Sequence, residues 1–556
     1  MENNRVKEII NLFKKDFFNA EQFAEVYNIE KEKAFEILDN GVVNGVLFYA
    51  LESQNKLRSM FGTKENITDK NKEEYNKFLD DYFGELKEGI VLDLEETELR
   101  DKILEQLLLR KRNIATELLV KKIQKENYIY TTRDDIKSEM WIYREGIYIP
   151  QGKTFVQEYC RKILGSVYTS QFVNDVIGKI EAETFINQDD FFRNNLVWEL
   201  PVKNGILNIK TKKLLNFSPG KIFFNKLPVE YNPSKKCPKI EKHFETILRD
   251  KEDSKVMFEL IGYCLLKDSK LEKAFMFSGF GRNGKTKTME LIKRFLGVEN
   301  CSSLGLPQIN DNSFEIAELF GKMVNLAGDL SYYALKETGM LKQIIGRDSI
   351  SAKRKFLRVL HFTPFVKLIF ACNELPKIYD MSDGFWTKWV LLNFPYVFVT
   401  KEELEKINPE EKKKYRIKDP DIIEKITTPD ELSGLLNKAL ESLDNILKQK
   451  DFSYSKGTKE VKDLWIRKSD SFMAFCMDML EEDSESRISK KELRQKYRQY
   501  CKGQKGIKTA SDVAIKITLE QMFGAYEIQD WDSRERNWIG IKLKEIKEDV
   551  EILKIK

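Results

Sequence analysis

The residues Gly279 to Thr286 have the types and spacing of a phosphate-binding loop, since GFGRNGKT fits the pattern G-x-x-x-x-G-K-[ST]. Such a loop presents successive backbone N–H groups to an anion, and its glycines let the backbone wrap closely around phosphates. Lys285 would reach the β- and γ-phosphates, and the Thr286 hydroxyl would ligate Mg²⁺. We therefore predict that ATP with Mg²⁺ binds through Gly279, Phe280, Gly281, Arg282, Asn283, Gly284, Lys285 and Thr286.

The flanking residues indicate the elements that hold this loop. Residues 273–278 form a short apolar run typical of a buried strand, and residues 287–296 carry apolar side chains at the spacing of an amphipathic helix. A strand that leads through a glycine-rich loop into a helix N-terminus aims the loop at an anion. A chance glycine-rich turn is the alternative, and this context disfavours it.

Two further predicted strands end in polar residues that would complete an ATPase site. Residues 322–328 lead to Asp329, which we predict to hold the metal and polarise water; a helix-capping Asp is the alternative. Many such motifs end in two acids, whereas here one acid would do both jobs. Residues 366–372 lead to Asn373, which could bond the attacking water or the γ-phosphate, or could simply form a turn. The combination of Lys285, Asp329 and Asn373 is more specific than any one of them.

These motifs resemble those of the superfamily 3 helicases of the AAA+ class, in the branch found in phage and plasmid replication proteins and in poxvirus-type primase-helicases. Segments on both sides of the ATPase motifs, WIYREGIY, NGILNIKT and RKSDSFMAF, extend the resemblance over most of the chain. The central motifs that carry it are GFGRNGKT at 279–286, MVNLAGDLS at 323–331, LKQIIGRDSISAKRKF at 341–356, KLIFACNELPK at 367–377 and MSDGFWTKW at 381–389.

The resemblance implies a homo-oligomeric ring, usually a hexamer, with ATP sites between subunits and single-stranded DNA in the central channel. It also implies a channel-lining hairpin with a basic residue beside an aromatic one, which corresponds here to Lys353, Arg354, Lys355 and Phe356. Cations there would follow the phosphate backbone, and the phenyl ring would pack on sugars or bases. A solvated run of charge is the alternative.

One position departs from the family pattern. The family usually has an arginine pair after the Trp of its FW motif, and one member completes the neighbouring subunit's site. Here the pair is replaced by Thr387 and Lys388. Lysine supplies the charge but not the bidentate fork of arginine. We predict that Lys388 acts at the subunit interface. The sequence does not decide whether Arg347, Arg354 or Arg358 instead completes the neighbouring subunit's site.

Composition limits the classes of partner. A length of 556 residues predicts several domains. The formal charge of +5 is small for this length, so any affinity for nucleic acid must come from local basic patches. The seven cysteines include no C-x-x-C pair, which argues against a zinc site or a disulfide framework and for a reducing compartment. The sequence starts without a signal-peptide pattern and has no apolar stretch of bilayer length. We expect a cytoplasmic protein, in the host cytoplasm if viral or plasmid-encoded, with no membrane partner.

The predicted fold class is multidomain α/β, with a central AAA+ P-loop ATPase built on a parallel sheet, an α+β domain before it and a winged-helix domain after it. Short strands dominate the prediction from residue 126 to 233, with hairpins at 141–148 and 202–209, and a strand pair is predicted at 525–528 and 538–543. The predicted parts are a helical N-terminal region 1–110, the α+β domain 111–239, the ATPase domain 240–400, a helical connector 401–455 and the winged-helix-like DNA-binding domain 456–556.

The two ends of the chain carry further signals. Between Lys490 and Lys508 there are eight basic residues against one acid, a plausible duplex-binding stripe, although a soluble helix face is the alternative. An acid pair at 93–95 superficially resembles a primase motif. However, His243 and His361 are the chain's histidines and both lie far from it. We therefore predict no primase activity, and a primase or polymerase would be a separate partner.

Taken together, the motifs predict an ATP-dependent replicative DNA helicase of a virus, phage or plasmid-like element that forms a ring and translocates on DNA. The alternative is an ATP-switched origin-binding initiator that does not itself unwind DNA. A packaging motor is disfavoured, because no nuclease-like acid cluster follows the ATPase motifs.

Overall fold

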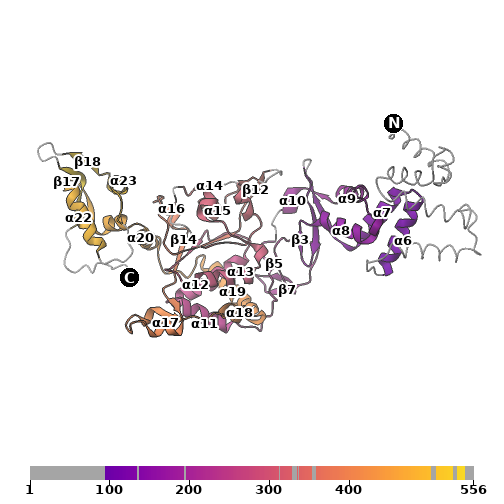
Figure 1. The fold of residues 1–556 in the computed structure, drawn as a ribbon, viewed down its shortest axis with the longest axis horizontal. Helices are drawn as coiled ribbons and strands as arrows, with labels where there is room; N and C mark the ends of the chain where they lie inside the picture. Colours follow the sequence, from indigo (N-terminus) through magenta and orange to yellow (C-terminus); the bar gives the residue numbers. More distant parts are fainter. Residues whose placement is uncertain are drawn as a thin grey trace, which may run out of the picture. The chain divides into compact units, whose positions relative to one another are not determined.

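The computed structural model describes residues 94–133, 137–192, 196–311, 314–328, 335, 337–353, 359–502, 509–529 and 535–544 (Figure 1). The chain divides into two compact units. The first is Met1–Arg193 with Pro219–Ile222, and the second is Asn194–Ser218 with Phe223–Lys556. The finer division into five parts that the sequence suggests stays a prediction.

The first unit packs helices on one face of a small sheet with strand order β3-β2-β1-β4. Apolar residues of α8 and α9 pack against Ile129 and Ile142 of this sheet. The predicted hairpin at 141–148 is confirmed: β2 and β3 pair with Arg144 opposite Ile147, around a turn in which Glu145 and Gly146 have positive φ. The elements are α6 (Leu94–Leu108), α7 (Arg112–Glu126), β1 (Ile129–Thr132), β2 (Met140–Arg144), β3 (Ile147–Ile149), α8 (Gly152–Leu164), η2 (Gly165–Val167), α9 (Ser170–Thr184), β4 (Phe185–Ile186) and α10 (Gln188–Phe192).

The helices α8 and α9 correct the sequence interpretation, which expected mainly short strands in this part of the chain. The pattern is nevertheless helical, since Val156, Cys160 and Ile163 are buried at a spacing of about one turn. Thr169 caps α9 by accepting a hydrogen bond from the Phe172 amide. Strands lie on both sides of these helices in the sequence, and their patterns led to the prediction of β structure for the whole stretch.

The second unit begins with an antiparallel sheet of β5 (Glu199–Val202), β6 (Gly205–Asn208) and β7 (Lys213–Leu215). It confirms the predicted hairpin at 202–209, with Val202 opposite Gly205. Gly205 has a φ of +154°, and a Cβ there would lie 2.5 Å from the Leu215 carbonyl oxygen, so the strands can approach closely only with glycine. Leu200 and Leu207 pack into the same core as the large sheet of this unit.

The large sheet is parallel, with strand order β14-β8-β13-β10-β9. Its strands are β8 (Ala274–Ser278), β9 (Cys301–Ser302), β10 (Val324–Ala327), β13 (Lys367–Cys372) and β14 (Trp389–Asn393). The three apolar runs that the sequence assigned to strands are thus confirmed as β8, β10 and β13. All residues of these three strands are buried, as expected for a parallel sheet covered on both faces.

Helices cover both faces of this sheet. Figure 1 shows α12, α13 and α19 on one side and α14 and α15 on the other, and the apolar cores of the two faces are separate. The first face carries α11 (Pro238–Ile247), α12 (Lys251–Leu265), α13 (Lys285–Leu296), α18 (Ile422–Ile426) and α19 (Pro429–Gln449). The second carries α14 (Leu306–Asp311), η4 (Glu315–Leu319), α15 (Gly339–Ile345), α16 (Asp383–Trp386) and α20 (Thr458–Ser469).

Smaller elements join these layers. They are η3 (Val298–Asn300), an antiparallel pair of β11 (Ile350–Ala352) and β12 (Leu360–Phe362), a parallel pair of β15 (Val397–Val399) and β16 (Tyr415–Ile417), α17 (Lys401–Glu405) and η5 (Lys412–Lys414). The strand β16 is a second correction, because it lies within residues 401–455, which were expected to form a helical connector.

A buried lysine ties the start of β13 to the end of α12. The Lys367 ammonium donates to the carbonyl oxygens of Leu266 (2.7 Å), Asp268 (3.0 Å) and Phe365 (2.6 Å). Burial lowers the pKa of this amine to about 7. Without the lysine these carbonyl groups would lose a donor, at a cost of about 1–3 kcal/mol each. Lys367 therefore fixes β13, the strand that leads to Asn373.

The C-terminal part of the second unit has its own core, built around Phe472, Phe475, Leu519 and Trp538. Its elements are α21 (Ser471–Met479), β17 (Leu480–Ser489), α22 (Lys490–Cys501), α23 (Asp512–Phe523), β18 (Tyr526–Gln529) and β19 (Arg536–Leu543). The predicted strand pair is confirmed as β18–β19, and β17, which the sequence did not suggest, completes an antiparallel sheet of order β17-β19-β18. Across the described residues, no helix combines the length and hydropathy that crossing a membrane requires.

Candidate nucleotide site

The glycine-rich loop connects β8 to α13 and is held in a tight conformation. Gly281, Arg282 and Gly284 have positive φ values of +84°, +47° and +91°. Gly279 is restricted by space instead, because a Cβ there would lie 2.0 Å from Asn283 Nδ2 and 2.6 Å from the Phe394 carbonyl oxygen. The loop therefore needs its glycines for backbone freedom at two positions and for close packing at a third.

Lys285 is the first residue of α13 and is buried, with 5% of its surface exposed. Its Nζ donates to the Gly279 carbonyl oxygen at 2.6 Å and to Asn283 Oδ1 at 3.1 Å, both within the loop. A third bond, at 3.2 Å, goes to Asn373 Oδ1. The amine is thus held over the loop by oxygen atoms that a phosphate oxygen can replace as acceptors.

Asn373 reaches this amine because of the strand order. β13 lies next to β8 in parallel register, with Cys372 opposite Ser278, so the residues that follow the two strands emerge at the same edge of the sheet. Asn373 is exposed there, and a Cβ added to Gly281 would lie 4.0 Å from its Oδ1. Lys285, Gly281 and Asn373 therefore surround one small region of this edge.

The segment from Phe394 to Phe398 frames the other side of the loop. Asn283 Nδ2 donates to the Phe394 carbonyl oxygen at 3.4 Å, and the Phe398 amide donates to the Arg282 carbonyl oxygen at 2.7 Å. Arg282 also pairs with Glu403 of α17 at 3.1 Å, but both side chains are exposed and the pair contributes little. The position of β14 beside β8 brings this segment to the loop, which no local pattern could reveal.

Phe280 and Thr286, like Arg282, are accessible on the loop. Phe280 is 89% exposed, and Thr286 is exposed in the first turn of α13, where helical N–H groups have no partner within the helix. An exposed hydroxyl beside such N–H groups suits a metal ion that bridges phosphates. The loop, the buried lysine and this hydroxyl together fit a nucleoside triphosphate with Mg²⁺.

Lys388 lies at the opposite edge of the sheet. It immediately precedes β14, and its carbonyl oxygen accepts from the amide of Ala274 at the start of β8. The length of β14, about 16 Å, therefore separates it from the loop of its own chain. Its Nζ pairs with Glu272 Oε2 at 2.8 Å. Arg347 is held nearby: it pairs with Asp268 at 3.1 Å, and a Cβ at the adjacent Gly346 would lie 3.5 Å from Lys388 Nζ.

The remaining predicted site residues are mostly outside the described part of the chain. These are the proposed metal ligand Asp329, the hairpin residues Arg354, Lys355 and Phe356, and the alternative finger residue Arg358. The strand before Asp329, β10, is described and lies next to β13. Lys353 is described as well: it is exposed, and its Nζ lies 6.0 Å from the centre of the Phe314 ring.

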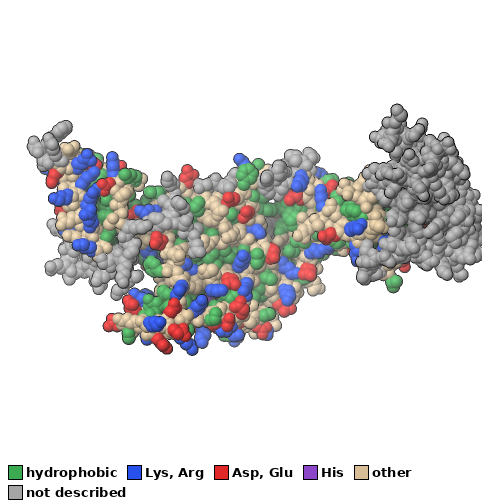
Figure 2. Space-filling view, viewed as in Figure 1, with side chains coloured by type: hydrophobic (Ala, Val, Ile, Leu, Met, Phe, Trp, Pro, Cys, Tyr) green, Lys and Arg blue, Asp and Glu red, His purple; other side chains and the backbone are tan. Residues whose placement is uncertain are grey.

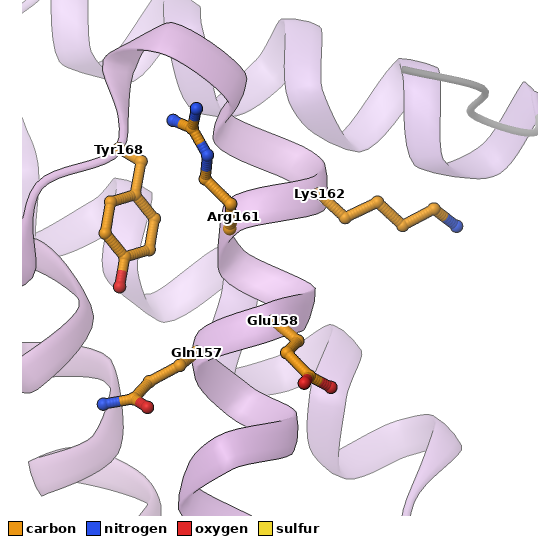
Figure 3. A pocket seen from close by; sticks show the side chains of 5 residues that line it. All are labelled: Gln157, Glu158, Arg161, Lys162 and Tyr168. Atoms are coloured by element: carbon orange, nitrogen blue, oxygen red, sulfur yellow. The ribbon is translucent and has the colours of Figure 1, made fainter. Parts of the chain in front are cut away.

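The first unit has a surface hollow around α8, lined by Gln157, Glu158, Arg161, Lys162 and Tyr168 (Figure 3). Its cations are engaged within the protein. Arg161 donates to the Gly165 carbonyl oxygen and lies over the Tyr168 ring, whereas Lys162 points away and pairs with Glu96 at 2.6 Å. This hollow therefore lacks the phosphate-binding features of the loop.

Family models match two parts of the chain. The model described as "D5 N terminal like" matches residues 98–251, and one described as "Family of unknown function (DUF5906)" matches residues 277–384, which include the loop and Asn373.

The similar curated proteins are viral. "Putative helicase L207/L206" of Acanthamoeba polyphaga mimivirus is 23% identical over 317 residues, which cover 53% of this chain and 31% of that protein. "Putative helicase 121R" of Invertebrate iridescent virus 3 is 23% identical over 333 residues, covering 54% and 34%. "Putative helicase V13" of Sputnik virophage is 24% identical over 276 residues, covering 47% and 34%. The chain spans about a third of the length of these relatives.

Among solved structures, the C-terminal region of NrS-1 in its apo form matches 76% of this chain and 98% of that chain, with 15% identity and a TM-score of 0.39. The matched family model and the viral relatives support a similarity of this chain to the phage and viral superfamily 3 helicase-like proteins, the group that includes the primase-helicases. The resemblance that the motifs suggested is thus confirmed.

Proposed function

We propose that the chain is an ATP-dependent replicative DNA helicase of a virus, phage or plasmid-like element that works as a ring on DNA. The observation that carries the proposal is the convergence of Lys285 and Asn373 on the glycine loop, at the carboxyl edge of the parallel sheet. The strand order β14-β8-β13-β10-β9, in which the loop-bearing β8 lies between β14 and β13, supports an AAA+ type of ATPase. The viral relatives named as helicases support the same class of activity.

The proposed site divides its roles among residues of different strands. Bound Mg²⁺-ATP would supply the phosphoryl group and the charge-neutralising metal. The loop N–H groups and Lys285 would bind the phosphates, Thr286 with Asp329 would hold the metal, and Asn373 would orient the attacking water. Lys388 would complete the site of a neighbouring subunit, since it lies too far from its own loop. That geometry supports a ring, most simply a hexamer.

DNA would contact the chain in two places. The hairpin Lys353, Arg354, Lys355 and Phe356 would line the channel around a single strand. The C-terminal part, in which helices pack on a small antiparallel sheet, supports a winged-helix-like domain that binds duplex DNA.

The duplex contact is supported by the charge on α22. Figure 2 shows Lys and Arg side chains gathered over this helix. Lys491, Lys496, Arg498 and Lys502 are exposed, and none of them makes an ion pair with another described residue. Lys490 and Arg494, in contrast, pair with Glu527 and Asp512.

A forked-duplex unwinding assay with ATP tests the proposal. The wild-type chain should separate the strands, and Lys285→Ala should abolish ATP turnover and unwinding while keeping the fold. Lys355→Ala should keep basal ATP turnover but lose DNA stimulation and unwinding. ATP-dependent DNA binding without strand separation would instead identify an origin-binding initiator. Electron micrographs that show rings would favour the helicase.

A further inference from the structure

The last turn of α20 reaches the same edge of the sheet as the glycine loop. Lys468 Nζ lies 3.4 Å from Oδ1 of Asn393, the last residue of β14. Asn393 is opposite Ser278 in the sheet, and its Oδ1 also accepts from the Ser278 hydroxyl at 3.4 Å. Since Ser278 directly precedes Gly279, the Lys468 amine lies beside the strand that leads into the loop.

The end of α20 is anchored at this edge from the Asn373 side as well. The indole N–H of the buried Trp465 donates to the Pro376 carbonyl oxygen at 2.9 Å. Lys377 pairs with Asp470, directly after α20, at 2.7 Å. Pro376 and Lys377 belong to the segment that follows Asn373. The end of α20 is therefore joined both to this segment and to the end of β14.

Aromatic packing fixes the angle of the helix. The Trp465 ring lies edge-on to Trp386 and Trp389, with centroids 5.7 Å and 5.1 Å apart. This contact places α20 on the face of the sheet opposite to α13, because Trp465 belongs to the core of α15 and α16. Lys468 and Lys285 thus reach the edge of the sheet that carries the glycine loop from opposite faces of the sheet.

The surroundings of Lys468 lack a counter-ion. Its side chain is half-buried, and among the described residues it pairs with no carboxylate; its hydrogen-bond acceptor is the neutral amide of Asn393. Burial lowers its pKa from the ordinary value. The neighbouring cation Arg467 pairs with Asp478. Cations removed from water are normally paired, so a half-buried lysine with a neutral acceptor suits a site that an anion enters.

We propose that Lys468 is a second cation of the nucleotide site and binds the terminal phosphate of a nucleoside triphosphate. The inference rests on the proposed function and adds a residue from outside the ATPase motifs. Lysine is a flexible point charge on a long stem, so the amine can leave Asn393 for a phosphate oxygen without movement of α20. Lys468 then distinguishes a triphosphate from a diphosphate, whereas Lys285 and the loop bind both.

The test compares affinities of the full chain for two probes, ATPγS and ADP, with Mg²⁺ by calorimetry. Lys468→Met keeps the apolar stem and removes the charge. It should weaken ATPγS binding about tenfold or more, the loss expected for a charge-assisted hydrogen bond, and change ADP binding less than twofold. Lys468→Arg should restore most of the ATPγS affinity. The matched control is Lys462→Met on the same helix, whose amine donates to the Met381 carbonyl oxygen at 2.9 Å and which should leave both affinities unchanged.

The outcomes separate this inference from the proposed function. Unchanged ATPγS affinity in Lys468→Met overturns the role of Lys468. An equal loss for ATPγS and ADP overturns it too, since the residue then acts through the fold of the site. If Lys285→Ala binds both nucleotides like the wild type, the nucleotide site itself is wrong. The unfolding temperature of Lys468→Met should equal that of the wild type. The change in affinity then reflects the site and not a loss of folded protein.

Discussion

The Lys285 amine donates to the side-chain oxygen of Asn373 at 3.2 Å, across 88 residues of sequence. The contact joins Lys285, which lies at the end of the loop that follows β8, to Asn373, which directly follows β13. It exists because these strands are parallel neighbours whose carboxyl ends meet. A phosphate that enters the loop would take this amine as a partner and leave the Asn373 amide to bond water.

Replacing Asn373 should affect ATP turnover much more than ATP binding. In Asn373→Ala the loop and Lys285 remain, so we expect ATP affinity to stay near that of the wild type while kcat falls about a hundredfold, as for loss of one aligned polar group. In Asn373→Asp a carboxylate would pair with Lys285 and repel the γ-phosphate, so ATP affinity should fall about tenfold as well. Steady-state turnover and calorimetric Kd measure both effects. Wild-type kcat in Asn373→Ala would contradict the role.

A methyl group at Gly279 tests the fit of the loop. The added Cβ would overlap Asn283 Nδ2 and the Phe394 carbonyl oxygen, so the loop must move. We expect Gly279→Ala to lose measurable ATP binding and to lower the unfolding temperature. The control is Gly339→Ala, where a Cβ meets nothing within 4 Å and φ is ordinary; this variant should bind ATP normally. Tight ATP binding by Gly279→Ala would show that the loop geometry is not required.

The sequence predicted the part of the site that depends on local pattern. The loop, the strands β8, β10 and β13, and the convergence of Lys285 with Asn373 follow from a motif and from the rule that parallel strands end at one edge. The hairpins followed from turn residues such as Asn204 and Gly205. Asp329 was also predicted from a pattern, and Lys355 was implied by the family resemblance. Both stay predictions because they lie outside the described residues.

What the sequence could not predict depends on contacts between distant segments. Lys468 lies far along the chain from the loop, and its place depends on Trp465 packing against Trp386 and Trp389. The same holds for Phe394, whose carbonyl oxygen restricts Gly279 only because β14 is the neighbour of β8. A lysine in a charged helix gives no signal of its own. Strand order and helix packing decide which cations reach the edge of the sheet that carries the glycine loop.

Mixing two inactive variants tests whether Lys388 acts on a neighbouring subunit. Lys388→Ala should bind ATP normally but turn it over about a hundredfold more slowly. In a ring mixed equally with Lys285→Ala chains, about a quarter of the interfaces combine an intact loop with an intact Lys388, so ATPase activity should return in part. The control replaces Lys388→Ala by the Lys285→Ala/Lys388→Ala double variant, which should give no recovery. Absence of recovery in the first mixture would contradict action in trans.

The salt dependence of DNA binding tests the basic face of α22. Lys491, Arg498 and Lys502 lie on one side of the helix over about 16 Å, a length that matches about five phosphates along one strand. Replacing all three by Ala should weaken duplex binding and reduce the slope of log K against log salt by about 0.9 for each lost phosphate contact. Fluorescence anisotropy of a labelled duplex across a salt series measures this slope.

The matched control for α22 replaces two basic residues of the same helix whose side chains already form ion pairs within the protein. Lys490 and Arg494 pair with Glu527 and Asp512, so their replacement by Ala should change the slope much less than the triple variant does. Equal effects of the two sets would mean that overall charge, and not the exposed face of α22, governs binding. An unchanged slope in the triple variant would move the duplex contact away from this helix altogether.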